Sequence, residues 1–220
     1  MTSPLPPPSS PLAARIQGVY AITADETETR VLLRKVEAAL QAGIRVLQYR
    51  NKLASAALKV AQLSALKALC DQHRCLLIVN DDWRLALDLG IEAVHLGRDD
   101  GDLAEARAAM GDSTLIGVSC YASLDRARQL APKADYLAFG ALFASGTKPQ
   151  ASGAALSVLT QARALNLGRP IVGIGGIDAG NLPQVLSAGA NAGAVIGALF
   201  NQPDVGAAAR QLLAAAALHE

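Results

Sequence analysis

The chain has 220 residues, of which 51% are hydrophobic and only 4% are aromatic. This size and composition fit one large domain with a substantial core, in which helices pack on parallel strands, and they disfavour an aromatic-rich β-sandwich. The formal net charge of +1 gives no sign of a surface for nucleic acid or another polyanion. Any phosphate would therefore be bound at a local site.

The cysteines and the N-terminal segment bear on the cellular compartment. Cys70, Cys75 and Cys120 show no metal-ligand spacing, and their odd number indicates reduced thiols, so we expect a cytoplasmic protein. The segment Met1 to Pro11 is rich in Pro and Ser but lacks a basic start and a long apolar run, so we expect neither a signal peptide nor a membrane anchor. We expect residues 1–14 to be a flexible tail and residues 15–220 to be one domain.

Short apolar runs alternate with segments of helical periodicity along the rest of the chain. This pattern indicates a parallel sheet with covered faces, and eight cycles of roughly 25 residues match a (β/α)8 TIM barrel of the α/β class. A doubly wound open sheet is the alternative, but no Gly-rich dinucleotide fingerprint follows the first run, and an eighth run fits closure better. The expected strands are Gly18–Thr23, Arg45–Arg50, Cys75–Asn80, Ala93–Gly97, Thr114–Ser119, Tyr136–Gly140, Pro170–Gly176 and Ala192–Leu199, and the clearest helices are Arg30–Ala42, Ala54–His73, Leu103–Met110 and Leu182–Ala188.

Barrel enzymes carry their active sites at the carboxyl ends of the strands, so the residues that end each run are the candidates. The first run ends at Thr23 and is uninformative. In the second, Gln48, Arg50 and Lys52 alternate and point to one side of an extended backbone. Two cations and an amide on one face suit an anion and a polar ring edge. The alternative is a strand end that frays into solvent.

The third and fourth runs end in acidic residues. Asn80, Asp81 and Asp82 follow one strand, and Asp99 and Asp100 follow the next. The alternative interpretation is that these residues only begin the next helices, with one residue of each group acting as the helix cap. Paired acids beside a cationic strand exit suit Mg²⁺, which usually takes one or two carboxylates together with phosphate oxygens of the ligand.

The fifth and sixth runs add neutral donors and a loop. Ser119 ends the fifth run, where its hydroxyl can donate to an anion. The segment from Ser145 to Lys148 is rich in hydroxyls and carries a cation, which fits a lid or an anion clamp, although such loops are often surface turns. His95 lies inside an apolar run and is expected to be a core histidine whose ring nitrogens are hydrogen-bonded.

The seventh and eighth runs end in glycines. Gly175 and Gly176 end one run and Gly197 lies at the end of the other, where glycine lets the backbone approach a ligand, although close packing of small residues is the alternative. The loops after strands seven and eight are the frequent phosphate site of this barrel class. The mouth would then bind two anions, a metal-bound diphosphate as leaving group and a second phosphorylated molecule as nucleophile.

At this point the sequence resembles the thiamine phosphate synthase (thiamine phosphate pyrophosphorylase) family from about Gly18 to Leu213. Each motif alone is weak, but six occur in order. They are Gln48 to Lys52, Asn80-Asp81, Val94 to Asp100, Gly117 to Ser119, Phe139 to Lys148, and Gly173 to Ile177.

The resemblance implies a (β/α)8 barrel that joins 4-amino-2-methyl-5-(diphosphooxymethyl)pyrimidine to a thiazole phosphate, or its carboxylated form. The products would be thiamine phosphate and diphosphate, with Mg²⁺ as cofactor. The family's reaction is thought to be dissociative, so that diphosphate leaves first and the thiazole nitrogen then captures a pyrimidine-stabilised cation. The residues agree with this, since they offer positioning and charge neutralisation but no obvious nucleophile.

The resemblance also assigns roles to individual residues. The pyrimidine diphosphate would be bound by Gln48, Tyr49, Arg50, Asn51, Lys52, Asn80, Ser119 and Lys148, of which Arg50, Lys52, Ser119 and Lys148 would be catalytic. The thiazole phosphate would be bound by Ser145, Gly146, Thr147, Gly176, Ile196 and Gly197, and Mg²⁺ by Asp81 and Asp100.

Four positions depart from the family pattern. Arg98 stands where Gln is common and adds a charge beside the metal site, whereas Ser145 replaces Thr and keeps the hydroxyl. Ala141 replaces a common Pro, and Gly197 stands where Ser is common, so that a backbone contact survives but a hydroxyl contact does not. We expect the thiazole phosphate site to be intact but slightly altered.

Two other functions stay open. A thiazole tautomerase resembles the synthase in fold but would need only the phosphate site of strands seven and eight. A non-catalytic binder of thiamine precursors would be expected to lack a metal carboxylate or Lys148, and neither is missing. The habits of the fold suggest a homodimer, and no nucleic acid or membrane partner is expected.

Overall fold

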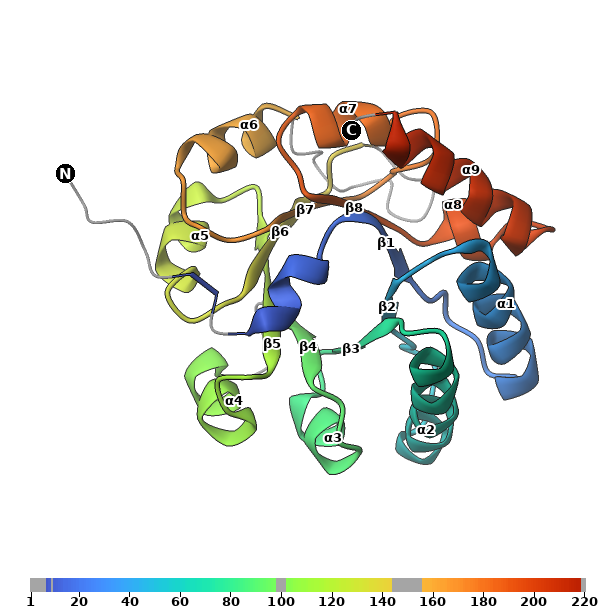
Figure 1. Cartoon of the computed structure of the whole chain (residues 1–220). Helices are drawn as coiled ribbons and strands as arrows, with labels where there is room; N and C mark the ends of the chain where they lie inside the picture. Colours follow the sequence, from blue (N-terminus) through green and yellow to red (C-terminus); the bar gives the residue numbers. More distant parts are fainter. Residues whose placement is uncertain (1–6, 9, 98–101, 144–155, 219–220) are drawn as a thin grey trace.

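The computed structural model describes residues 7–8, 10–97, 102–143 and 156–218. Eight parallel strands close into a barrel in chain order, β1 to β8, with helices around the outside (Figure 1). This confirms the (β/α)8 prediction and excludes the open sheet. The elements are η1 (Pro11–Arg15), β1 (Gly18–Ile22), α1 (Thr29–Ala42), β2 (Val46–Tyr49), α2 (Ala56–Gln72), β3 (Leu76–Asn80), α3 (Trp83–Asp88), β4 (Ala93–Leu96), α4 (Leu103–Met110), β5 (Leu115–Tyr121), α5 (Leu124–Leu130), β6 (Tyr136–Gly140), α6 (Ser157–Ala164), β7 (Ile171–Ile174), α7 (Leu182–Ser187), β8 (Ala192–Val195), α8 (Gly197–Phe200) and α9 (Val205–Ala217).

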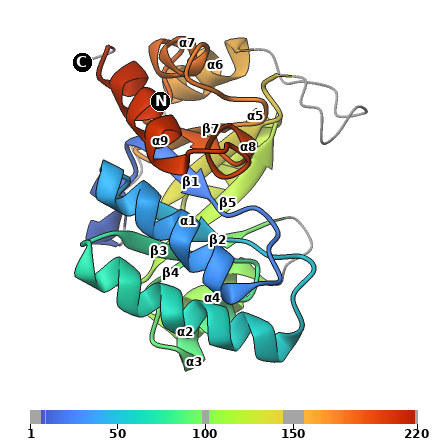
Figure 2. The same ribbon diagram turned by 90° about the vertical axis from the view of Figure 1, so that its right-hand side faces the viewer.

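The strands divide the core into two layers, because successive side chains of a strand point to opposite faces. Tyr20, Ile22 and Val46 belong to the cluster that fills the barrel interior. Val19 and Leu47 belong to the larger cluster between the barrel and its helices. Figure 2 shows α1 and α2 lying side by side over this outer layer. Each fully buried Val, Leu or Ile contributes about 1.5–3 kcal/mol, so both layers stabilise the barrel.

Polar caps set where several helices begin. Ser55 accepts a hydrogen bond from the N–H of Leu58 at the start of α2, and Asp82 accepts one from Leu85 at the start of α3. Asp102 and Ser123 cap α4 and α5 in the same way. Such a cap contributes about 1 kcal/mol and helps to fix the first residue of each of these four helices.

The largest shortfalls from the expected strand ends are at the seventh and eighth strands, and a new helix follows the last one. The seventh strand stops at Ile174 because Gly175 and Gly176 adopt positive φ values of 105° and 65°. The eighth stops at Val195, and Gly197–Phe200 forms the short helix α8 instead of more strand. Hydrophobic periodicity cannot separate a buried strand from a short buried helix within one apolar run.

The N-terminal segment is ordered further than expected. We expected a flexible tail through residue 14, but Pro11–Arg15 forms the 3-10 helix η1, and Ser10, Ala13 and Ile16 are buried. Ala13 and Ile16 pack into the interior cluster with Tyr20. In Figure 1 this short blue helix lies across the ring of strands. It closes the end of the barrel opposite the carboxyl ends of the strands.

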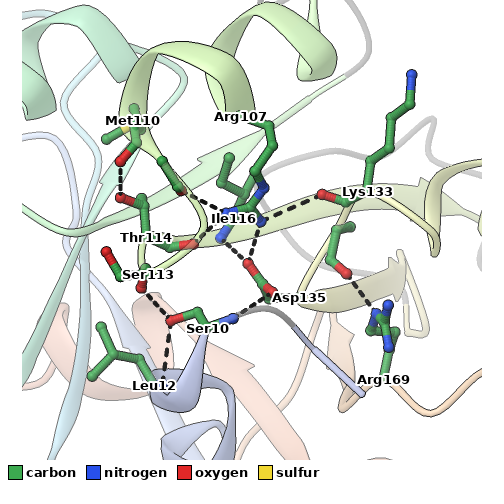
Figure 3. A network of polar contacts seen from close by, with 12 residues as sticks. Ser10, Leu12, Arg107, Met110, Ser113, Thr114, Ile116, Lys133, Asp135 and Arg169 are labelled. Atoms are coloured by element: carbon green, nitrogen blue, oxygen red, sulfur yellow. Dashed lines mark hydrogen bonds and ion pairs between the residues drawn. The ribbon is translucent and has the colours of Figure 1, made fainter. Parts of the chain in front are cut away.

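A buried carboxylate holds this closure in place (Figure 3). Asp135 is only 1% exposed and accepts hydrogen bonds from the N–H of Ser10 at 3.1 Å and of Ile116 at 2.8 Å. The guanidinium of Arg107 pairs with the same carboxylate at 2.5 Å. The Ser10 hydroxyl donates to the carbonyl of Ser113 at 2.6 Å. Asp135 thus ties the N-terminal segment to α4 and β5.

The three cysteines are free and buried. The neighbouring Cys75 thiol, together with burial, raises the pKa of Cys70, and burial raises the pKa of Cys120 to about 12. Both thiols therefore stay protonated and unreactive near neutral pH. No helix in the described part of the chain is long and apolar enough to span a membrane.

Candidate active site

The carboxyl ends of three strands place polar side chains at the barrel mouth. Gln48 on β2 is 3% exposed, and its side-chain Nε2 donates to Oδ1 of Asn80 on β3 at 3.3 Å. Ser119 on β5 lies beyond β4, whose His95 is in register with Asn80. The predicted pyrimidine-side residues Gln48, Asn80 and Ser119 are therefore brought to one end of the barrel. The Gln48–Asn80 bond leaves the Gln48 carbonyl oxygen as the acceptor for a ligand's amino group.

The cationic segment after β2 is braced by the end of β1. Thr23 is fully buried, and its hydroxyl donates to the carbonyl of Arg50 at 2.8 Å while it accepts from the Arg50 N–H at 2.9 Å. Asp25 accepts from the N–H of Lys52 at 2.7 Å, and its carboxylate lies 3.5 Å from the Arg50 guanidinium. Sequence reasoning treated Thr23 as uninformative. Because β1 and β2 are adjacent strands in a (β/α)8 barrel, the sequence could have indicated that Thr23 lies beside Arg50.

Tyr49 and Asn51 face away from the barrel interior. The Tyr49 hydroxyl donates to Oε1 of the buried Gln62 on α2 at 2.7 Å, and Nδ2 of Asn51 donates to the same oxygen at 3.0 Å. Asn51 and Gln62 also donate to the carbonyl of Glu26. These two side chains hold the loop that presents Arg50, and their predicted contact with the pyrimidine diphosphate stays a prediction. Gln62 was not identified from the sequence, because it lies on the buried face of α2, where apolar residues are expected.

The acidic residues after β3 have separate tasks. Asp82 caps α3, as the sequence predicted for one member of this group. Asp81 adopts a left-handed backbone with φ of 68°, which Asp tolerates better than most residues, and its N–H donates to the carbonyl of His95 at 2.8 Å. Left-handed non-glycine residues cluster at functional sites. The cap leaves the Asp81 carboxylate as the better candidate for a metal.

The exits of β2 and β3 share one recess. It has a volume of about 80 Å³ and lies on the helix side of the strand ends, because the outer-layer residues Tyr49, Leu63 and Leu85 line it together with Arg50, Lys52, Asn80 and Asp81. Cations and a carboxylate around one recess fit an anion together with a metal ion. No group of three or more His, Cys, Asp or Glu side chains in the described ranges could enclose a metal by itself. A site with so few protein carboxylates suits Mg²⁺, which keeps water and phosphate ligands, better than it suits a metal enclosed by protein ligands alone.

His95 lies in the barrel interior between two hydroxyls. Its Nδ1 is 3.0 Å from the Tyr136 hydroxyl, and its Nε2 is 2.9 Å from the hydroxyl of Ser119. The prediction of a hydrogen-bonded core histidine is confirmed. Burial raises the pKa of Tyr136 well above its ordinary value, so its phenol stays neutral.

The ends of β7 and β8 form the other half of the mouth. A Cβ on Gly175 would lie 2.7 Å from Ala141, so only glycine fits where the two loops meet. Asn181 donates to the carbonyl of Gly176 at 2.9 Å and fixes this turn. Ile196 precedes the short helix α8, which begins at Gly197, and the first N–H groups of a helix have no partner within it. The predicted residues Gly176, Ile196 and Gly197 thus lie at strand ends where backbone N–H groups can meet a phosphate.

Several predicted site residues lie outside the described residues. They are Asp100, Ser145, Gly146, Thr147 and Lys148.

Comparison with known proteins agrees with this geometry. The family model for thiamine monophosphate synthase matches residues 19–199. The chain belongs to the thiamine monophosphate synthase family. A thiamine-phosphate synthase of Methylobacillus flagellatus is 52% identical over 197 residues, covering 89% of this chain and 93% of that protein. One of Bordetella pertussis is 50% identical over 204 residues, covering 90% and 94%.

A solved structure also supports membership of the thiamine monophosphate synthase family. Thiamine phosphate pyrophosphorylase from Pyrococcus furiosus superposes with a TM-score of 0.84 at 29% identity, covering 94% of this chain and 98% of that one. The resemblance inferred from the motifs is confirmed. The chain is a transferase of thiamine phosphate synthesis.

Proposed function

We propose that the chain couples 4-amino-2-methyl-5-(diphosphooxymethyl)pyrimidine with a thiazole phosphate, or its carboxylated form, to give thiamine phosphate and diphosphate. The observation that carries this proposal is the shared recess at the exits of β2 and β3. It gathers Arg50, Lys52, Asn80 and Asp81 from two strands around one small space. Cations beside a carboxylate suit a diphosphate bound together with a divalent cation.

On the pyrimidine side, the positions support a division of labour. Gln48 meets the amino-substituted ring edge, because its carbonyl oxygen remains available beside Asn80. Arg50 and Lys52 neutralise the diphosphate, and Ser119 and Lys148 donate to it. Asp25 and Thr23 hold the Arg50 segment in place, so the cation needs little reorganisation when the ligand binds.

Mg²⁺ is the proposed cofactor, held by Asp81 and Asp100. When bound, it would neutralise charge on the departing diphosphate. Asp81 and Asp82 both line the recess, but Asp82 caps α3, so Asp81 is the better candidate of the two. The cations Arg50 and Lys52, which line the same recess, would share the task of neutralising the diphosphate.

On the thiazole side, Ser145, Gly146 and Thr147 together with the backbone N–H groups of Gly176, Ile196 and Gly197 bind the phosphate. The turn fixed by Asn181 and the start of α8 support this assignment. Binding two anions on opposite halves of one mouth brings the thiazole nitrogen toward the pyrimidine methylene. The described residues offer donors and charges rather than a nucleophile, which suits a dissociative substitution.

A coupling assay tests this function. Purified protein is mixed with the pyrimidine diphosphate, thiazole phosphate and Mg²⁺, with and without EDTA, and thiamine phosphate is followed by fluorescence after oxidation. We expect product that disappears with EDTA. Thiazole phosphate binding without product would instead favour a tautomerase or a non-catalytic binder, and binding of neither substrate would refute the proposal.

A further inference from the structure

A row of hydrogen-bonded side chains crosses the barrel interior from its closed end to its mouth. The hydroxyls of Tyr20 on β1 and Tyr136 on β6 lie 2.8 Å apart, and both side chains are buried. The Tyr136 hydroxyl is 3.0 Å from Nδ1 of His95, whose Nε2 is 2.9 Å from the Ser119 hydroxyl. Four strands thus supply one continuous chain of polar groups that ends at a residue of the proposed diphosphate site.

The barrel is shaped to let this row form. A Cβ on Gly117 would lie 1.9 Å from Cζ of Tyr136, so the Tyr136 ring occupies the space that any other side chain on β5 would fill. The same ring stacks on His95 with centroids 5.6 Å apart and planes inclined by 29°. Gly117 of the Gly-Val-Ser motif therefore leaves room for the Tyr136 ring beside His95. This packing explains the glycine without a ligand contact.

Counting protons gives the row a direction. If Tyr20 donates to Tyr136, Tyr136 donates to Nδ1 of His95, and His95 Nε2–H donates to Ser119. Every buried proton then has an acceptor, and the Ser119 proton is left to donate at the mouth. In the reverse direction the Tyr20 proton would need another acceptor. Within the described part of the chain, Tyr136 is the only hydrogen-bond partner of the Tyr20 hydroxyl. A buried hydroxyl proton without an acceptor is costly, so the first direction is favoured.

The two phenols keep their protons near neutral pH. Burial raises the pKa of Tyr20 and of Tyr136 above the ordinary tyrosine value, so neither loses its proton near neutrality.

We propose that Tyr136 is a positioning residue for the reaction at the mouth. By donating to Nδ1 of His95 it fixes the Nε2–H tautomer, which makes Ser119 an acceptor from the histidine and turns the Ser119 proton toward the departing diphosphate. This inference rests on the proposed function for the role of Ser119. The tautomer itself does not depend on that function.

Nuclear magnetic resonance of protein labelled with ¹⁵N-histidine tests the direction of the row in the wild-type chain. The sequence has three histidines, and the His95→Gln variant assigns the resonances of His95 by their loss. We expect a neutral His95 ring with its proton on Nε2. A proton on Nδ1, or a doubly protonated ring, would overturn the proposal whether or not the protein is active.

Kinetics test the effect on the reaction. Tyr136→Phe removes one hydroxyl without changing ring packing, and we expect kcat to fall roughly 5- to 10-fold with an unchanged KM for thiazole phosphate. In a Ser119→Ala background the same change should have no further effect, because the residue on which it acts is gone. Unchanged kcat in Tyr136→Phe, or additive losses in the double variant, would refute the positioning role.

Thr114→Val is the matched control. Thr114 is buried, its hydroxyl donates to the Met110 carbonyl at 2.8 Å, and it lies directly before β5, away from the mouth. We expect this variant to melt at a lower temperature than wild type but to keep its kcat. Wild-type protein that forms no thiamine phosphate would refute the proposed function, while the tautomer measurement would still decide the direction of the row.

Discussion

Replacing Asp135 by Ala should destabilise the fold without changing the chemistry. The carboxylate is 1% exposed and accepts from Ser10, Ile116 and Arg107. Breaking a buried ion pair by removing one partner costs about 3–5 kcal/mol. Arg107 is 15% exposed and also donates to the carbonyls of Thr114 and Gly111, so the lower end of that range applies.

A loss of about 3 kcal/mol corresponds to a fall in Tm of roughly 6–12 °C for a domain of this size. The assay is thermal unfolding followed by circular dichroism, with coupling activity measured well below the transition. Asp125→Ala is the control, because the side chains of its ion pair are exposed, Asp125 at 86% and Arg128 at 50%. Such a pair should contribute less than about 1 kcal/mol. The reasoning would be refuted if Asp135→Ala melted within 2 °C of that control, or lost its kcat while folded.

Three further changes test the site and the packing. Arg50→Ala should lower kcat/KM by roughly 10- to 150-fold and Ser119→Ala by only about 2- to 12-fold, since a charge-assisted contact is stronger than a neutral one; steady-state kinetics showing the reverse order would undo the assignment. Asp81→Asn keeps a residue that tolerates φ of 68°, so turnover with Mg²⁺ should fall at least about 100-fold with Tm unchanged, and near-normal turnover would contradict the metal site. Burial raises the pKa of Tyr49 from 10.0 to about 12. Because the unfolded chain loses this proton first, the associated stability is present below pH 10 and is lost as pH rises through about 12, and urea unfolding curves that do not change over this range would exclude it.

The barrel fold and the polar residues at the ends of β2 and β3 could be predicted from the sequence, because both follow from local patterns. Alternating apolar runs and helical segments gave the strand order, and parallel strands then placed the polar residues after β2 and β3 side by side. The alternation of Gln48 and Arg50 predicts that both point to one face, and Gln48 contacts Asn80 of the neighbouring strand. The same alternation places Tyr49 and Asn51 on the other face, where they hold the loop.

The rest depends on contacts between residues far apart in the chain. Nothing local shows that Ser10 reaches Asp135, 125 residues away, or that Tyr20 meets Tyr136, 116 residues away. From the sequence alone, η1 resembles part of a tail, because the barrel end that it covers is formed by distant parts of the chain. Gln62 looks like one more polar residue on a helix, and only the folded chain shows it buried beneath Tyr49.

A crystal structure of the protein with diphosphate, Mg²⁺ and thiazole phosphate would test the two-anion mouth most directly. The account predicts diphosphate against Arg50 and Lys52 with the metal on the Asp81 carboxylate. It predicts the thiazole phosphate at the backbone N–H groups of Gly176 and Gly197. Diphosphate and metal bound away from the β2 and β3 exits, or both anions at the β7 and β8 exits, would contradict it.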